Sequence, residues 1–243
     1  MSRIGITCLG SGAALGRGRG WSSILIDGKI LLDLPPTAIP QLYRTGKDIS
    51  AIDFIFISHF HADHSFGIPF FLLLYHFLLS RDRPLYFIGP QGIAERTKKL
   101  CELAWPEIMK KGLAPRLSLN YVEVKSDGEY RAGELYFHAV RMEHFDLDAY
   151  GYRFSYNGHE IAYTGDTGEC PQLHRLIEGA DIVITEFTYP TPTDDPGHLD
   201  VRAVARIGKE VNPAGTVLAT HLGGEPIPPS GVTLCRDGET YLI

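Results

Sequence analysis

The chain has 243 residues, 44% of them hydrophobic, so it can bury a full core without disulfides or partner chains, and we expect one domain over residues 1–243. Its net charge of −6 gives no general attraction to nucleic acid and counts against a large polyanionic substrate. The four cysteines lie far apart and form no C-x-x-C pair, which argues against a thiolate zinc site or a redox motif.

The chain opens with short predicted strands and a glycine-rich loop. Strands are predicted over residues 4–9, 23–26 and 30–32. The loop at residues 10–20 has no G-K-[ST] sequence and opens no helix, so a nucleotide-binding loop is the weaker interpretation. We interpret it as a mobile loop at the rim of a site.

Strand-like and helix-like segments alternate through the rest of the chain. Strands are predicted over residues 52–57, 85–88, 121–124, 135–140, 152–156, 160–163, 182–186 and 217–220, and helices over 66–79, 92–104, 171–178 and 201–211. This alternation is typical of a layered α/β domain. The longest apolar run, residues 68–79, is short of the ~20 residues that span a bilayer, and the N-terminus has no signal-peptide pattern. We therefore expect a cytoplasmic protein without a membrane span.

A dense cluster of polar residues follows the apolar strand predicted at residues 52–57. It reads His59-Phe-His61-Ala-Asp63-His64. Three imidazoles and a carboxylate so close together are costly to bury without partners, and a metal ion removes that cost. Nitrogen and carboxylate ligands suit Zn²⁺, and also Mn²⁺ or iron. The alternative is a solvated polar turn that happens to contain histidines.

With this H-x-H-x-D-H signature the chain resembles the metallo-β-lactamase superfamily. The resemblance implies the α/β metallo-β-lactamase fold, an αβ/βα four-layer sandwich, and two divalent metal ions. It adds three later residues, each in a matching motif: His144 in MEHF, Asp166 in YTGDT and His221 in LATHL. By this resemblance one ion is held by His59, His61 and His144, the other by Asp63, His64 and His221, and Asp166 is shared. A cysteine that many antibiotic-hydrolysing members have at the Asp166 position is absent, so a β-lactamase is not expected.

Within the superfamily, the chain resembles the ribonuclease Z branch and its phosphodiesterase relatives. The resemblance rests on LGSGA at residues 9–13, WSSIL at 21–25, TEFT at 185–188 and GHLDV at 197–201. It implies that His198 protonates the leaving oxygen or holds a phosphate oxygen, and that Glu186 orients His198. A histidine that merely begins a helix is the alternative for His198. The glycine- and lysine-rich arm that this branch uses to clamp tRNA has no counterpart, so a small phosphodiester is preferred to RNA as substrate.

The resemblance also implies a mechanism, in which a hydroxide bridging the metal ions is the nucleophile and Asp63 helps to orient it. Asp33 is interpreted either as the acceptor that fixes a ligand histidine or as a structural turn residue. The same metal core could hydrolyse a carboxylic ester, lactone or thioester, and this second hypothesis stays open. A non-hydrolytic binding or redox-sensing protein is a third class, which the full ligand set disfavours. The family resemblance also suggests a homodimer.

Overall fold

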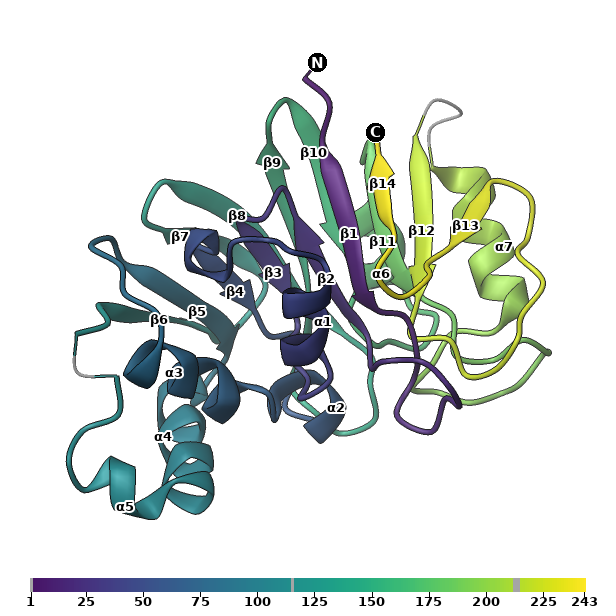
Figure 1. Ribbon diagram of the computed structural model, residues 1–243. Coiled ribbons are helices and arrows are strands. Elements are labelled where there is room, and N and C mark those ends of the chain that lie inside the picture. Colours follow the sequence, from purple (N-terminus) through teal and green to yellow (C-terminus); the bar gives the residue numbers. More distant parts are fainter. Residues whose placement is uncertain (1, 115, 212–214) are drawn as a thin grey trace.

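Two sheets form the centre of the computed structural model, which describes residues 2–114, 116–211 and 215–243 (Figure 1). The first sheet is seven-stranded, in the order β14 (Thr240–Leu242), β1 (Gly5–Gly10), β2 (Ser23–Ile26), β3 (Ile30–Leu32), β4 (Phe54–Phe56), β5 (Leu85–Pro90) and β6 (Leu119–Val124). The second, also seven-stranded, has the order β13 (Val232–Leu234), β12 (Thr216–Thr220), β11 (Ile182–Glu186), β10 (His159–Tyr163), β9 (Ala149–Tyr156), β8 (Leu135–Met142) and β7 (Gly128–Ala132). Both sheets mix parallel and antiparallel pairs.

Helices cover the outer faces of both sheets. The first sheet is flanked by α1 (Ala38–Arg44), α2 (Ala62–Ser65), α3 (Ile68–Phe77), α4 (Ile93–Ala104) and α5 (Pro106–Met109), with the 3-10 helix η1 (Ile49–Ala51) before β4. The second sheet is flanked by α6 (Pro171–Ile177) and α7 (Val201–Glu210). Figure 1 shows the helix, sheet, sheet, helix order. In the part of the chain that the structure describes, no helix is long and apolar enough to cross a bilayer.

The layers follow from the alternation of side chains along each strand. In β2, Ile24 and Ile26 belong to the core between the two sheets, whereas Leu25 belongs to the core beneath the first set of helices. In β11, Ile184 points into the central core and Val183 into the core beneath α6 and α7. Successive residues of a strand therefore pack alternately into the two cores on either side of the sheet, and the strands are buried on both faces.

The predicted elements are found, and short additional ones appear beside them. The strands predicted at residues 23–26, 30–32 and 182–186 have the same bounds in the structure, and the helix predicted at 66–79 is shorter, from Ile68 to Phe77. The additional elements are β7, β13, β14, α1, η1, α2 and α5. All of these elements are short. The strands β7, β13 and β14 are stabilised by pairing with a neighbouring strand, and a local apolar pattern does not reveal such pairing.

Candidate metal centre

The predicted ligands come from loops that follow strands of both sheets. The segment from His59 to His64 follows β4 and enters α2, and His144 follows β8. Asp166 follows β10, and His221 follows β12. The predicted ligands, which lie far apart in the sequence, are thereby brought to one end of the sandwich.

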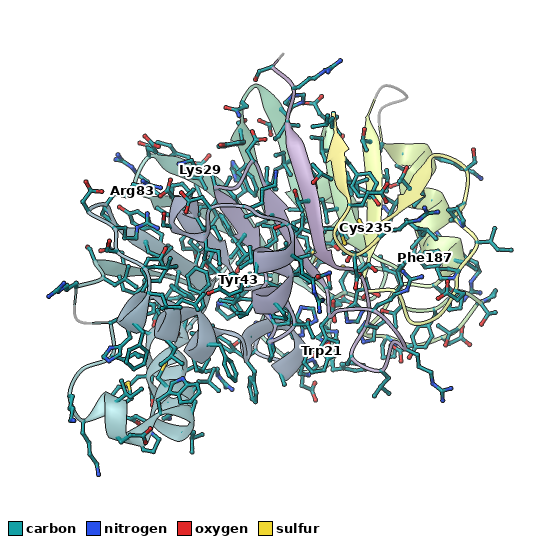
Figure 2. All side chains as sticks on the ribbon, viewed as in Figure 1. Trp21, Lys29, Tyr43, Arg83, Phe187 and Cys235 are labelled. Atoms are coloured by element: carbon teal, nitrogen blue, oxygen red, sulfur yellow. The ribbon has the colours of Figure 1, made fainter. Side chains whose placement is uncertain are left out.

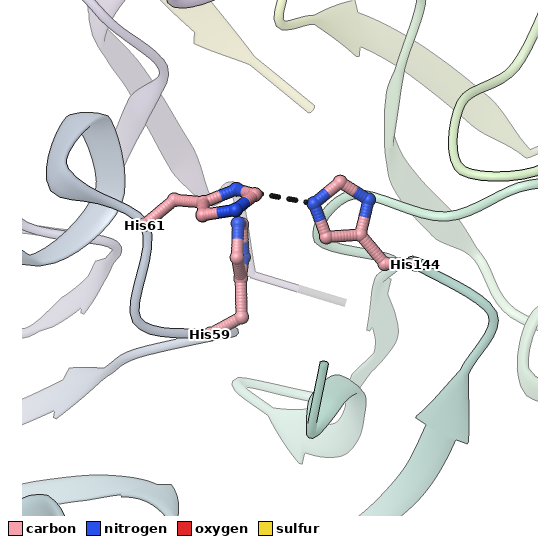
Figure 3. Close-up of side chains that lie close together, drawn as sticks. All are labelled: His59, His61 and His144. Carbon is pink, nitrogen blue, oxygen red and sulfur yellow. Dashed lines mark hydrogen bonds between the residues drawn. The ribbon is translucent and has the colours of Figure 1, made fainter. Parts of the chain in front are cut away.

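One group consists of His59, His61 and His144. Their ring centroids are 4.6 Å apart for His59 and His61, 4.7 Å for His59 and His144, and 5.0 Å for His61 and His144. The Nε2 atom of His144 lies 3.2 Å from Nδ1 of His61, and the rings face a common point (Figure 3). One ligand atom from each residue lies within 4.8 Å of the others, so the three could hold one ion.

A second group consists of Asp63, His64 and His221, whose ligand atoms also lie within 4.8 Å of one another. Asp166 lies beside this group, with Oδ2 3.3 Å from Nε2 of His64 and 3.2 Å from Nε2 of His221. Asp166 also forms a group of the same span with His59 and His64. Its carboxylate therefore faces both sets of ligands, as a shared ligand must.

Buried nitrogen atoms without partners show that these side chains fit a metal. Among the residues that the structure describes, Nε2 of His59, His64 and His221 is buried and has no hydrogen-bond partner. Asp166 is close to two of them, but the angles do not suit a hydrogen bond. Leaving such atoms unpaired is costly, and coordination of divalent ions would satisfy all of them.

The charge states of His59 and Asp166 suit metal binding, whereas Asp166 and Asp33 outweigh burial and raise the pKa of His64 well above its usual value. Burial, together with the neighbouring His64, lowers the pKa of His59 well below its usual value, so its imidazole is neutral and has a lone pair to offer. Burial opposes the charged form of Asp166, but His221 and His64 outweigh it and hold the pKa of this carboxyl well below its usual range. Neutral imidazole and ionised carboxylate are the forms that coordinate metals.

The other ring nitrogen of each buried histidine is fixed by a partner. His64 Nδ1 donates to Asp33 Oδ2 at 2.7 Å, and His144 Nδ1 donates to the carbonyl of Gly197 at 2.8 Å. His59 and His221 reach a carboxylate through a hydroxyl group. Their Nδ1 atoms lie 3.0 Å from Ser58 Oγ and 2.8 Å from Thr188 Oγ1, and these hydroxyls donate to Asp33 and Glu186. Nε2 of His59, His64 and His221 is thereby left without a partner, and Nε2 of His144 faces His61.

Comparison with known proteins identifies the family of the chain. The family model described as "Beta-lactamase superfamily domain" matches residues 24–222. The chain belongs to this superfamily. The fold, the family and the hydrolase class predicted from the sequence are confirmed.

Individual relatives match this superfamily member over most of its length and of their own. Ribonuclease BN from Enterobacter sp. (strain 638) is 25% identical, and the match covers 85% of this chain and 84% of the relative. The structure of human tRNase Z, short form, has a TM-score of 0.77 with 22% identity and 98% coverage of both chains. A diphosphatase from the PhnP family has a TM-score of 0.75 with 22% identity, covering 100% of this chain and 98% of the other. At these identities the two structures show the fold alone.

The proposed proton donor of this superfamily member lies beside the ligands. His198 Nδ1 is 2.9 Å from Glu186 Oε1 and 4.0 Å from Asp166 Oδ2. The His198 ring stacks on the His221 ring, with centroids 5.4 Å apart. Burial opposes the charged form of His198, but Glu186 outweighs it and raises the pKa to about 9. The ligand atom of His198 also lies within 4.8 Å of those of His144 and Asp166, although its Nδ1 is engaged by Glu186.

The structure adds residues that the sequence interpretation missed. Ser58 and Thr188 are the hydroxyl links described above, and the Tyr163 hydroxyl donates to Asp33 at 2.5 Å. Their only sequence signal is position: Ser58 precedes His59 directly, and Thr188 follows Glu186 by two residues. Of the two interpretations of Asp33, the contacts favour the acceptor of a ligand histidine.

The glycine-rich loop lies at the rim of the centre. Ala13 N donates to the carbonyl of Leu222, the residue after His221, and a Cβ atom on Gly16 would lie 3.0 Å from that same carbonyl oxygen. Trp21 closes the loop through a bridge to Gly12 and lies at the same end of the molecule as α2 (Figures 1 and 2). The loop borders the predicted site and leads into β2 rather than into a helix.

The remaining histidines have partners away from the centre. His76 Nδ1 accepts from Ala114 N, and His159 Nε2 donates to the carbonyl of Ser2. His138 lies near Glu129, and His174 lies near Glu210. None of them takes part in the groups of metal-ligating residues found among the described residues.

Proposed function

We propose that this protein is a metal-dependent phosphodiesterase related to ribonuclease Z, with a dinuclear centre that acts on small phosphodiesters. The observation that carries the proposal is the contact of His198 with Glu186 beside Asp166. A phosphodiesterase needs an acid at this place more than a hydrolase of carbonyl compounds does. The reason is that an alkoxide leaving from phosphorus is a poor leaving group unless it is protonated. The named relatives, a ribonuclease and a diphosphatase, support the same class of reaction.

The residues that would hold the metals and perform the reaction can be assigned roles. We assign His59, His61 and His144 to one ion and Asp63, His64 and His221 to the other, with Asp166 shared. When bound, two divalent ions, zinc in this proposal and manganese or iron as alternatives, supply Lewis acids and a hydroxide nucleophile at neutral pH. Asp63, with its side chain 12% exposed, accepts a hydrogen bond from the nucleophile and orients it.

His198 acts on the leaving oxygen. Its Nδ1–H donates to Glu186, which keeps the imidazolium form stable and the ring in place. Its Nε2–H is then available to a substrate, since the His198 side chain is 16% exposed. The proton moves from Nε2 to the leaving oxygen as the phosphorus–oxygen bond breaks. Glu186 is thus a positioning residue, and it also anchors Thr188, which holds His221.

The surface around His198 favours a small substrate. A hollow of about 340 Å³ beside His198 is lined by acidic residues: Glu143, Glu169, Asp194, Asp195 and Asp200. Glu169 is paired with Arg206, and Arg202 lies within ion-pairing distance of both Asp200 and the fully exposed Asp194, so the arginines offset only part of the negative charge. The remaining negative charge repels the further phosphates of a long polynucleotide. RNA is the second candidate substrate, favoured by the 25% identity to ribonuclease BN over 85% of the chain.

A substrate comparison tests the proposed reaction. Protein reconstituted separately with Zn²⁺ and Mn²⁺ is offered bis-p-nitrophenyl phosphate, p-nitrophenyl acetate, a lactone and a tRNA precursor with a 3′ trailer. We expect turnover of the phosphodiester to exceed that of the ester and the lactone in kcat/KM. Turnover of the ester or lactone alone would reject the proposal in favour of a carbonyl hydrolase, and cleavage of the precursor would establish the RNA candidate.

The role of His198 predicts a dependence on the leaving group. In His198→Gln, kcat is expected to fall about 10²-fold for a phenyl phosphodiester and much less for the p-nitrophenyl analogue, whose leaving group needs little protonation. His174→Gln is the matched control, because His174 also contacts a glutamate but lies on the surface. An equal loss with both substrates would show that His198 serves the metal site or the structure rather than the leaving oxygen.

Three further predictions belong to this proposal. They are a single domain over residues 1–243, a cytoplasmic location and a homodimer. The family resemblance supports the homodimer, and the length and composition support the single domain.

A further inference from the structure

An exposed aromatic ring borders the proposed proton donor. Phe145 follows His144 directly, and 54% of its surface is exposed. Its ring centroid lies 4.9 Å from that of His144 and 5.8 Å from that of His198. A large apolar side chain therefore stands half in solvent between a predicted metal ligand and the group that would protonate the leaving oxygen.

The backbone at Phe145 is strained. Its φ angle is +50°, in the left-handed region that bulky side chains rarely adopt. Hydrogen bonds on both sides hold it there: Gly168 N donates to the carbonyl of Glu143 at 2.6 Å, and Leu147 N donates to the carbonyl of His144 at 3.2 Å. Glycine or asparagine would adopt this conformation with less strain. Phenylalanine therefore occupies the position despite the strain that it causes in the backbone.

The neighbouring loop makes room for the ring. A Cβ atom on Gly197 would lie 2.5 Å from Cζ of Phe145, so a side chain there would displace the ring. The carbonyl of Gly197 accepts from His144, and its N–H donates to Asp195 at 2.9 Å. One loop thus fixes a predicted ligand and seats the ring, while the next residue along it is His198.

We propose that Phe145 forms a subsite on the leaving-group side of the centre that takes a flat, uncharged aromatic group. This inference rests on the proposed phosphodiesterase function, because the leaving-group side is defined by His198. The ring offers a face for stacking, which suits any nucleobase or a simple aryl group. Glu143, Asp194 and Asp195 line the adjoining hollow and disfavour a second negative charge on that group.

Substrates matched in acidity test the subsite. Zinc-reconstituted protein hydrolyses phenyl methyl phosphate, hexafluoroisopropyl methyl phosphate and thymidylyl-3′,5′-thymidine, and kcat/KM is compared between wild type, Phe145→Gly and Phe145→Leu. The first two leaving groups have similar acidity, but only the first is aromatic. In parallel, calorimetry measures the Kd of phenylphosphonate and methylphosphonate, which reports the subsite without turnover.

We expect both variants to lose about tenfold in kcat/KM for the aromatic substrates and less than twofold for the aliphatic one. The preference for phenylphosphonate over methylphosphonate should fall by a similar factor. A loss with phenyl alone, or with the dinucleotide alone, identifies which aromatic group the subsite takes. Phe145→Gly relieves the φ strain, so its Tm should equal or exceed that of Phe145→Leu, and a folding defect would not imitate the result.

Tyr136→Ala is the control, because Tyr136 is an exposed aromatic residue near the start of β8, roughly 25 Å along the strand from His144. Equal losses with aromatic and aliphatic substrates, or no change in the phosphonate preference, would overturn the subsite while leaving the phosphodiesterase intact. A wild-type protein that hydrolyses none of the phosphodiesters, but retains the phosphonate preference through Phe145, would overturn the proposed function and leave the aromatic subsite standing.

Discussion

Replacing Asp166 by asparagine is expected to lower kcat for phosphodiester hydrolysis at least about 10³-fold, because stabilisation of transition-state charge by metals amounts to several kcal/mol. Asp166 is 3% exposed and lies within 3.3 Å of Nε2 of both His64 and His221. Since Asp166 faces both ligand groups, its loss should strongly weaken the binding of one ion and displace the other from its position. Elemental analysis by mass spectrometry should then show about half the bound metal of the wild type.

The isosteric amide keeps the packing of the loop after β10, which makes Asp166→Asn preferable to alanine for this experiment. Asp82→Asn is the control, because Asp82 is an exposed aspartate on the loop before β5. Full metal content together with activity within a few fold of wild type would contradict the shared-ligand assignment. Full metal content with lost activity would instead move the role of Asp166 from holding the metals to orienting the nucleophile.

The sequence was informative wherever a pattern is local. The continuous apolar runs in β2 and β11 reflect burial on two faces, and each of these strands lies where the pattern predicted it. The cluster from His59 to His64 is equally local, because its predicted ligands lie on one short segment that runs from the end of β4 into α2. His144, Asp166 and His221 could be named only through the family resemblance, since single residues after strands carry no chemical signal of their own.

Features that arise from long-range contacts could not be predicted. The link from His59 through Ser58 to Asp33 joins the end of β4 to the residue after β3, and the link from His221 through Thr188 to Glu186 joins two neighbouring parallel strands. The positive φ of Phe145 likewise depends on hydrogen bonds around it and on Gly197. The sequence contains these residues, but only the packing of the two sheets gives them their roles.

Asp33→Asn is expected to lower the free energy of unfolding by about 3 kcal/mol and the metal affinity by about 10- to 100-fold. Asp33 is fully buried and accepts from the backbone N–H and the hydroxyl of Ser58, from the hydroxyl of Tyr163 and from His64. Asparagine fits the same space and tolerates the φ of +56° at this position. Its amide nitrogen, however, would face a donor, and the remaining buried donors would lose a charged acceptor.

Urea unfolding and a competitive zinc titration measure the two effects separately. Asp48→Asn is a matched control, because Asp48 also accepts from the N–H and hydroxyl of a serine, Ser50, but is exposed, so its loss should cost about 1 kcal/mol or less. Lower stability with unchanged metal affinity would show that Asp33 only stabilises the turn after β3. Lower affinity as well shows that His64 depends on Asp33 for its orientation, because no other contact found for His64 Nδ1 among the described residues could replace it.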